Sequence, residues 1–248
     1  MIDIHCHILP MIDDGAKSVE MALDMLDAAY RDGTDEIVLT PHLAYEYNFI
    51  NPKDKIIPLF EDLTYIVKRE GIPIKMYLGT EYLFSSPSSF LEHKNDIRTM
   101  NGTQYLLMEF FFDVKEEDVL EAIDMVLENG WIPIIAHAER FECMQISSSL
   151  PVRAIEKGAL LQLNKASVLG KHGHRAKECA FYFLDHHYYS FVGSDAHHPV
   201  LRDSKMFDAY RIICDYYGRS YANRIFYENP SKMLENVDIR KREKDEEK

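Results

Sequence analysis

Cysteine is scarce in this chain, and its spacing excludes two common kinds of small scaffold. Four cysteines occur among 248 residues, and none belongs to a Cys-x-x-Cys pair. Disulfide-rich secreted domains and zinc fingers both need more closely grouped cysteines. The cysteine content therefore favours a reducing compartment, and we expect a cytoplasmic protein. The four residues are Cys6, Cys143, Cys179 and Cys214.

Positive charge is also in short supply. Asp and Glu number 41 against 28 Lys and Arg, which gives a formal net charge of −13. Such a balance disfavours nucleic acid or an anionic membrane surface as the main partner. It would also repel an anionic substrate, unless bound cations reverse the local field.

Long hydrophobic stretches are absent as well. No apolar run reaches the ~20 residues that a membrane helix needs, so we expect no membrane-embedded segment. The amino terminus lacks the basic segment and apolar run of a signal peptide. Hydrophobic residues nevertheless make up 46% of the chain, which indicates an ordered globular protein with a sizeable core.

Short strand-like runs alternate with helical patterns about seven times. The strand-like runs cover residues 1–9, 36–40, 72–81, 105–110, 131–140, 159–164 and 190–198. The helical patterns begin at Ser18 and cover 51–70, 118–129, 151–158, 176–185 and most of the chain after Arg202, while Ser85–Ser89 suits a loop. Short connections predict parallel β/α units in one domain, residues 1–238, followed by a charged tail, 239–248, that we expect to be disordered.

Seven β/α units favour a barrel, in which functional groups gather at the carboxyl ends of the strands. An open doubly wound sheet is the alternative, but it would not bring seven strand ends to one point. Nearly every predicted strand end carries a residue type that binds metals. The strand-end residues are His5, His7, His42, Glu81, Glu109, His137, Arg140, Asn164, Asp195 and His197.

Imidazoles and carboxylates without a thiolate suit Mn²⁺, Fe²⁺, Zn²⁺, Co²⁺ or Mg²⁺. Each residue alone has a structural interpretation, since Glu81 or Glu109 could simply pair with Arg140. Their coincidence at one end of the predicted strands favours a metal site. The candidates are too many for one ion, so two or three ions bridged by a carboxylate explain them better. A site of that kind points to phosphoester hydrolysis.

The order of these motifs resembles a known family. HCH (5–7), DDG (13–15), TPH (40–42), GTE (79–81), MEF (108–110), HAER (137–140) and GSDAH (193–197) occur in sequence. Together they resemble the PHP (polymerase and histidinol phosphatase) superfamily. Within it, the chain is most similar to the manganese-dependent protein-tyrosine phosphatases of Gram-positive capsule and exopolysaccharide synthesis. The similarity extends over about residues 1–236.

The resemblance implies a distorted (β/α)7 TIM-like barrel with two or three ions, Mn²⁺ first among them. It assigns His5, His7, Glu81 and Asp195 to one ion, Glu81, Glu109 and His137 to a second, and Asp14, His42 and His197 to a third. Asp13 is left out of the ligand set, as a turn residue or as a carboxylate that contacts a ligand from behind. A hydroxide bridging two ions would attack the phosphorus of a phosphotyrosine. Arg140 would neutralise the phosphoryl oxygens, with Arg202 as a second candidate.

A thiolate nucleophile is disfavoured. Cysteine-dependent phosphatases need an arginine six residues after the cysteine, and here those positions hold Ile12, Ser149, Asp185 and Ser220. The aromatic residues after His42, among them Tyr45, Tyr47 and Phe49, either line a groove for the target tyrosine or form a hydrophobic lid or oligomer contact.

The partner that the resemblance implies is a phosphotyrosine protein, the tyrosine-rich tail of an exopolysaccharide tyrosine kinase. Assembly into a homo-oligomer is left open. The alternatives are a small-molecule phosphatase of the histidinol-phosphate type and a polymerase-type PHP nuclease module. The acidic, free-standing chain argues against the second of these.

Overall fold

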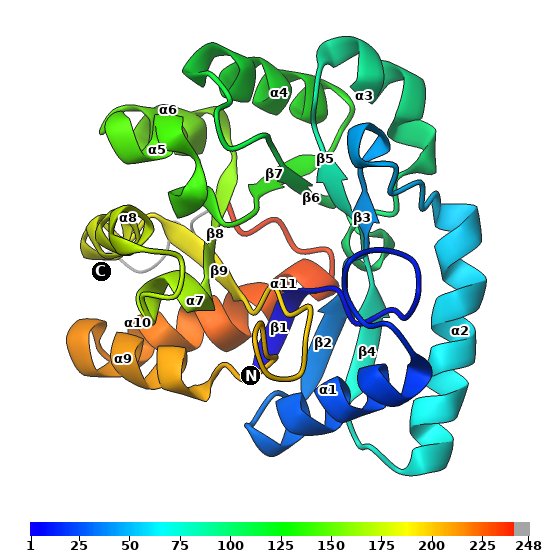
Figure 1. Ribbon diagram of the computed structural model, residues 1–248. Coiled ribbons are helices and arrows are strands. Elements are labelled where there is room, and N and C mark those ends of the chain that lie inside the picture. The colour runs from blue at the N-terminus through cyan, green and yellow to red at the C-terminus, as the bar shows by residue number, and fades with distance from the viewer. Residues whose placement is uncertain (241–248) are drawn as a thin grey trace.

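Strands and helices alternate along the chain in the computed structural model, which describes residues 1–240 (Figure 1). The strands are β1 (Ile2–Cys6), β2 (Glu36–Leu39), β3 (His42–Leu43), β4 (Lys75–Leu78), β5 (Glu81–Leu83), β6 (Tyr105–Glu109), β7 (Ile132–Ile135), β8 (Leu160–Asn164) and β9 (Tyr189–Gly193). The helices are α1 (Val19–Arg31), α2 (Lys53–Glu70), α3 (Pro87–His93), α4 (Glu116–Glu128), α5 (Glu142–Ile146), α6 (Leu150–Lys157), α7 (Lys165–Val168), α8 (His174–Asp185), α9 (Phe207–Tyr217), α10 (Arg219–Asn223) and α11 (Asn229–Leu234). Within the expected tail, 241–248 lies outside the described residues.

The strands form a TIM-like barrel surrounded by helices, as the sequence predicts (Figure 1). Every strand pair is parallel, in the orders β1-β2-β4 and β3-β5-β6-β7-β8-β9. Residues 40–41 separate β2 from β3 and residues 79–80 separate β4 from β5, so each pair fills one of seven strand positions. The two sheets meet where Cys6 bridges Ala196, rather than forming one continuous closed ladder.

Helix α1 shows why the predicted helices form where they do. The Ser18 side chain accepts a hydrogen bond from the Met21 backbone N–H, a cap that contributes about 1 kcal/mol. Apolar side chains at helical spacing, including Ala22 and Leu26, are buried against the sheet. Just past the end of the helix, Gly33 adopts a φ of +100°, the conformation that favours glycine there.

Two local expectations are corrected. The segment Ser85–Ser89 is not a simple loop, because Ser86 caps helix α3 and Pro87 occupies its first turn. The predicted strands 131–140 and 190–198 end early, at Ile135 and Gly193. After them, His137 and Asp195 adopt positive φ angles of 34° and 51°. Such conformations are costly for residues other than glycine, and they often occur at functional sites.

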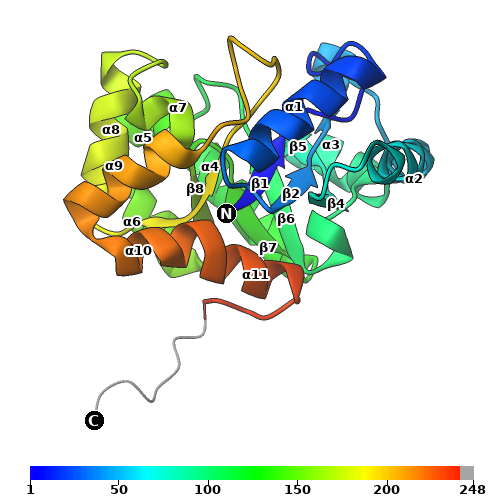
Figure 2. The same ribbon diagram turned by 90° about the horizontal axis from the view of Figure 1, so that it is seen from below.

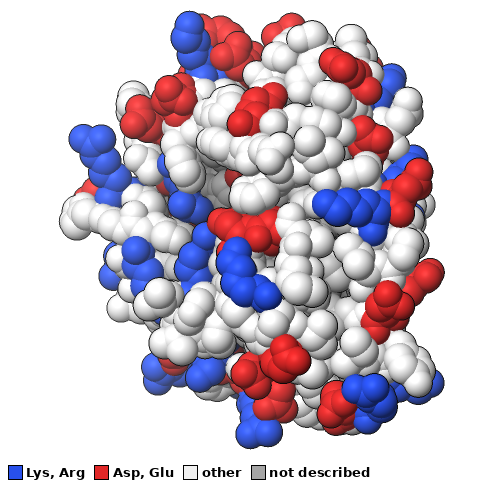
Figure 3. Space-filling view, turned by 45° about the vertical axis from the view of Figure 1, so that its right-hand side comes forward, with Lys and Arg blue, Asp and Glu red and all other residues white. Residues whose placement is uncertain are grey.

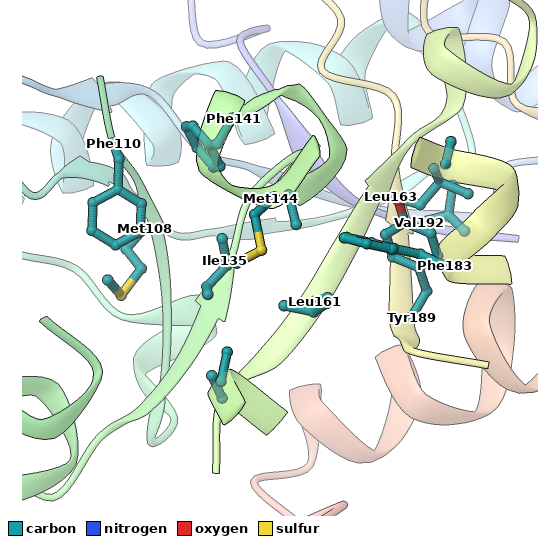
Figure 4. Close-up of a cluster of buried hydrophobic side chains, with 14 of the residues drawn as sticks. Met108, Phe110, Ile135, Phe141, Met144, Leu161, Leu163, Phe183, Tyr189 and Val192 are labelled. Atoms are coloured by element: carbon teal, nitrogen blue, oxygen red, sulfur yellow. The ribbon is translucent and has the colours of Figure 1, made fainter. Parts of the chain in front are cut away.

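Hydrophobic side chains pack on both faces of the strands. Alternate residues such as Val38, Leu107 and Ile134 form one cluster with Phe191, as expected for a barrel interior. A larger cluster lies between the strands and the surrounding helices. In Figure 4, strand residues such as Ile135, Leu161 and Val192 lie together with Met144 of α5 and Phe183 of α8.

The two ends of the barrel differ. Helix α11 and the chain after it cover the amino ends of the strands, where the Tyr105 hydroxyl donates a hydrogen bond to the Val237 carbonyl (Figure 2). The opposite end carries the loops that follow the strands, as barrel enzymes require. Among residues 1–240, no helix is long and apolar enough to cross a membrane.

Candidate metal centre

The predicted ligands meet at the carboxyl end of the barrel. Each of them has an ionisable atom of another within 3.4 Å. They come from β1 and the loop after it, from the first residues of β3 and β5, from the last residue of β6, and from the turns after β7 and β9. The set consists of His5, His7, Asp14, His42, Glu81, Glu109, His137, Asp195 and His197.

Glu81 lies at the middle of this set and is only 1% exposed. Its Oε2 is 3.1 Å from both His5 Nε2 and His7 Nε2, while its Oε1 is 3.0 Å from His137 Nε2. The same Oε2 is 3.2 Å from His42 Nδ1. A carboxylate surrounded by imidazoles on both oxygens has the position of a bridging ligand between two cations.

The ligand atoms form three overlapping groups. These are His5, His7 and Glu81; His42, Glu81 and Glu109; and His7, Asp14, His42 and His197. His42 therefore lies between the second and third groups, whereas the resemblance assigns it to the third alone. Asp195 is 3.7 Å from both His5 and His7, beside the first group. The assignment of each residue to an ion stays a prediction.

The converging nitrogen and oxygen atoms suit divalent cations better than they suit hydrogen bonds to one another. Within residues 1–240, buried Glu81 Oε2, Glu109 Oε1 and His42 Nδ1 have no hydrogen-bond partner. These atoms are close to one another, but their angles do not allow hydrogen bonds between them. Leaving such groups unpaired costs about 1–3 kcal/mol each. Imidazole nitrogens and carboxylate oxygens converging in this way suit Mn²⁺, Fe²⁺ or Zn²⁺.

Opposite charges dominate the electrostatics. Burial opposes the charged form of His5, but Glu81 and Asp195 outweigh it and raise its pKa to about 9. Despite burial, Glu81 and Glu109 likewise raise the pKa of His42 to about 10. The pKa of His197 moves the other way, to about 4, because of burial and the neighbouring His7. Protons compete with metal ions for such imidazoles.

Two residues behind the ligands orient them. Asp13 Oδ2 is 3.0 Å from His7 Nδ1 and also accepts the His42 backbone N–H. Asp13 thus contacts two of the predicted ligands from outside their set, and its exclusion from that set stays a prediction. Gln162 Oε1 is 3.0 Å from His5 Nδ1 and accepts the His137 backbone N–H. Sequence reasoning missed Gln162, because nothing in the sequence shows whether a glutamine within a strand contacts a ligand histidine or only packs in the core. Such partners fix the ring orientation of metal-binding histidines.

Gly15 gives the site a steric requirement. A Cβ at this position would lie 1.9 Å from the His7 carbonyl oxygen and 2.6 Å from His7 Cβ. We expect Gly15→Ala to displace His7 and to weaken Mn²⁺ binding at least roughly tenfold, measured by calorimetric titration. Gly130→Ala is the matched control, because it strains a φ of +79° in open space far from the ligands. Equal metal affinity in both variants would contradict this role.

Both predicted arginines lie against Asp195. Arg202 Nη2 is 2.7 Å from Asp195 Oδ1, and Arg140 Nη1 is 3.4 Å from Asp195 Oδ2. The Arg140 guanidinium also lies 4.7 Å from the ring centre of Phe112, which is half exposed. Arg140 thus pairs with Asp195, and not with the Glu81 or Glu109 that the sequence suggests, and Asp195 holds both guanidinium groups at the edge of the ligand cluster. Asn164 completes the contacts of Asp195, to which its Nδ2 donates at 2.8 Å.

The remaining sequence candidates separate into surface and interior groups. Tyr45 stacks on His93 and donates a hydrogen bond to Asp96, away from the centre. Phe49 stacks on His42, while Tyr47 is exposed and contacts Phe111 edge-on. Cys6 is buried, and burial raises the pKa of its thiol well above its usual value. A buried neutral thiol does not suit a nucleophile.

Comparisons with known proteins agree with the geometry. The family model "Capsular polysaccharide synthesis, CpsB/CapC" matches residues 1–235. The tyrosine-protein phosphatase CpsB of Streptococcus agalactiae is 32% identical over 242 residues, covering 95% of this chain and 99% of the relative. The tyrosine-protein phosphatase YwqE of Bacillus subtilis is 31% identical, covering 96% and 93%.

Solved structures give the same result. One solved structure superposes with a TM-score of 0.87 at 30% identity, covering 96% of this chain and 95% of the other. It belongs to a set that is described as YwqE from Bacillus subtilis and CpsB from Streptococcus pneumoniae, unique metal-dependent tyrosine phosphatases. The phosphotriesterase homology protein of Escherichia coli shares the fold alone, with a TM-score of 0.55 at 12% identity over 93% of this chain and 97% of that one.

Proposed function

Because the chain belongs to the CpsB/CapC family of capsular polysaccharide synthesis proteins, we propose that it is a metal-dependent tyrosine-protein phosphatase of capsule or exopolysaccharide synthesis. The observation that carries this proposal is the convergence of imidazole and carboxylate ligands around Glu81 at one end of the barrel. The reaction is hydrolysis of a phosphate monoester. The relatives' names and the description of the solved structure support it.

The ions proposed are two or three Mn²⁺, which would be held by the seven residues of the three groups together with His137 and Asp195. When bound, they would lower the pKa of a coordinated water and neutralise charge on the phosphoryl oxygens. Asp13 and Gln162 hold the His7 and His5 rings in position for them. The ligand chemistry also suits Fe²⁺, Zn²⁺ or Co²⁺. Mg²⁺ is a further alternative and is the hardest Lewis acid among these ions.

The arginines would bind the phosphoryl group. Arg140 and Arg202 flank Asp195, and a guanidinium fork matches two phosphoryl oxygens at once. Phe112 holds Arg140 through its ring face and leaves half of its own surface exposed. Phe112 offers an apolar wall for the phenol ring of phosphotyrosine, and exposed Tyr47, which contacts the adjacent Phe111, is a second candidate.

Within this function, the partner proposed is the tyrosine-rich tail of an exopolysaccharide tyrosine kinase. The relatives' names, tyrosine-protein phosphatase, support a phosphoprotein substrate, and the family description supports a role in capsule synthesis. A cytoplasmic location is proposed too, and four free cysteines support a reducing compartment.

The two arginines are expected to contribute unequally. We expect Arg140→Ala to lower kcat/KM on a phosphotyrosine peptide roughly a hundredfold, the usual loss for one preorganised donor. Arg202→Ala is expected to cost about tenfold, since its side chain is 40% exposed and water screens it more. The exposed Arg69→Ala on α2 is the control. An Arg140→Ala loss below twofold would remove this residue from the phosphoryl site.

One assay discriminates the alternatives. The purified chain with Mn²⁺ is incubated with a phosphotyrosine peptide, histidinol phosphate or single-stranded DNA, and phosphate release or strand cleavage is measured. We expect turnover of the peptide only. Turnover of histidinol phosphate alone would favour the small-molecule phosphatase, and cleavage of DNA would favour the nuclease module.

A further inference from the structure

A cavity lies directly beside the metal centre. Its volume is about 230 Å³, and it is bounded by the end of β8, helix α7 and the loop after β9. Asp195, Arg140 and Arg202 all line it, so the cavity includes the place where the phosphoryl group is proposed to bind. Six charged side chains line it: Arg140, Lys165, Lys171, Asp195, Arg202 and Asp203. A phosphoryl group occupies only part of such a volume.

The cavity is positively charged although the chain is acidic. Four of its lining residues are basic and two are acidic, in a protein whose formal net charge is −13. The remaining titratable lining residue is His172, whose pKa burial and Arg140 lower to about 4, so it is neutral at pH 7. Figure 3 shows one face of the molecule, on which acidic and basic groups border a recess. A cationic cavity of this kind attracts anions.

The cations are divided between the two carboxylates of the cavity, and each carboxylate with its cations is called here one end. Arg140 and Arg202 contact Asp195, whereas Lys165 and Lys171 contact Asp203. Lys165 is 2% exposed, and its Nζ is held at 2.5 Å from Asp203 Oδ1 and 2.8 Å from the Lys205 carbonyl. Its charge therefore compensates that of Asp203. Lys171 is 47% exposed and lies at a longer 3.3 Å from the same carboxylate, which leaves its ammonium group accessible.

We propose that Lys171 forms a subsite for an anionic group of the substrate next to the phosphotyrosine, a carboxylate of a neighbouring Asp or Glu. The proposal rests on the phosphatase function above and adds a substrate preference to it. The phosphoryl group binds at the Asp195 end, and the flanking carboxylate binds at the Asp203 end. Leu201, which is 75% exposed and also lines the cavity, offers an apolar contact to the peptide. A second phosphate on the same peptide has the same chemistry.

Paired peptides test this subsite. Phosphotyrosine peptides that carry either Asp or Asn on both sides of the tyrosine are compared through their kcat/KM values. The wild-type chain is expected to prefer the Asp peptide roughly fivefold at low salt, the effect of a partly exposed ion pair, and less at high salt. A third peptide with a second phosphotyrosine at the flanking position shows whether a phosphate is taken as well.

Substitutions then locate the preference. Lys171→Met is expected to bring the Asp/Asn ratio close to one, and Lys171→Glu to bring it below one. Lys68→Met, an exposed lysine on α2, is the matched control and should leave the ratio at its wild-type value. A wild-type ratio of one for both anionic peptides would overturn the subsite, as would a ratio unchanged in Lys171→Glu. Absence of turnover on every peptide would instead refute the phosphatase function itself.

Discussion

Glu81→Gln is expected to lower kcat/KM on a phosphotyrosine peptide by at least about a thousandfold, which corresponds to about 4 kcal/mol of transition-state stabilisation. Both carboxylate oxygens of Glu81 face imidazoles, at 3.0 Å from His137 Nε2 and 3.1 Å from His5 Nε2 and His7 Nε2. An amide keeps the shape of the side chain but loses the charge that would link two cations. The bound metal should therefore fall together with the rate.

Kinetics in excess Mn²⁺ and elemental analysis of the purified variant check this prediction. Glu121→Gln, which removes a carboxylate from the exposed face of α4, is the matched control and should behave like the wild-type chain. A Glu81→Gln variant that kept its metal and lost less than tenfold in kcat/KM would show that Glu81 is not a bridging ligand.

Asp195→Asn has the second largest expected effect, also about a thousandfold. This carboxylate lies 3.4 Å from His197 Nδ1, 2.7 Å from Arg202 and 3.4 Å from Arg140. It is thus the residue that joins the proposed ions to the proposed phosphoryl-binding arginines. Its loss should weaken metal binding and also release both guanidinium groups from their positions.

The double role gives this variant a distinctive behaviour. Saturating Mn²⁺ should restore metal occupancy in Asp195→Asn but not the full rate, because the arginines remain unanchored. Asp62→Asn on α2 removes an exposed carboxylate and serves as the control. Full recovery of kcat/KM at high Mn²⁺ would mean that Asp195 acts as a ligand only.

The barrel and the convergence of the strand-end residues could both be predicted, for one physical reason. Parallel strands joined by helices place their carboxyl ends on one side, so residues such as His42 and Glu109 meet although they are 67 positions apart. Periodicity also found helix α1 and its Ser18 cap. The structure therefore confirms the fold and the meeting of these side chains, whereas their roles as metal ligands stay a prediction.

Features that depend on the direction of a side chain or on the local backbone conformation could not be predicted. Gln162 orients His5 only because its side chain reaches past β9, the strand between β8 and β1. Gly15 matters because its Cα approaches the His7 carbonyl, and Lys171 because Lys165 already compensates Asp203. Strands β7 and β9 end early, at Ile135 and Gly193, because His137 and Asp195 soon after them adopt positive φ angles. No hydrophobic pattern reveals such a backbone conformation.

The most direct test compares one preparation in four states. Phosphate release from a phosphotyrosine peptide is measured with the metal-free chain and with the Mn²⁺-loaded chain, each before and after alkylation of its thiols. We expect no turnover without metal, full turnover with Mn²⁺, and little change on alkylation, since buried Cys6 and Cys179 have raised thiol pKa values. Turnover by the metal-free chain that alkylation abolishes would contradict a metal-dependent phosphatase.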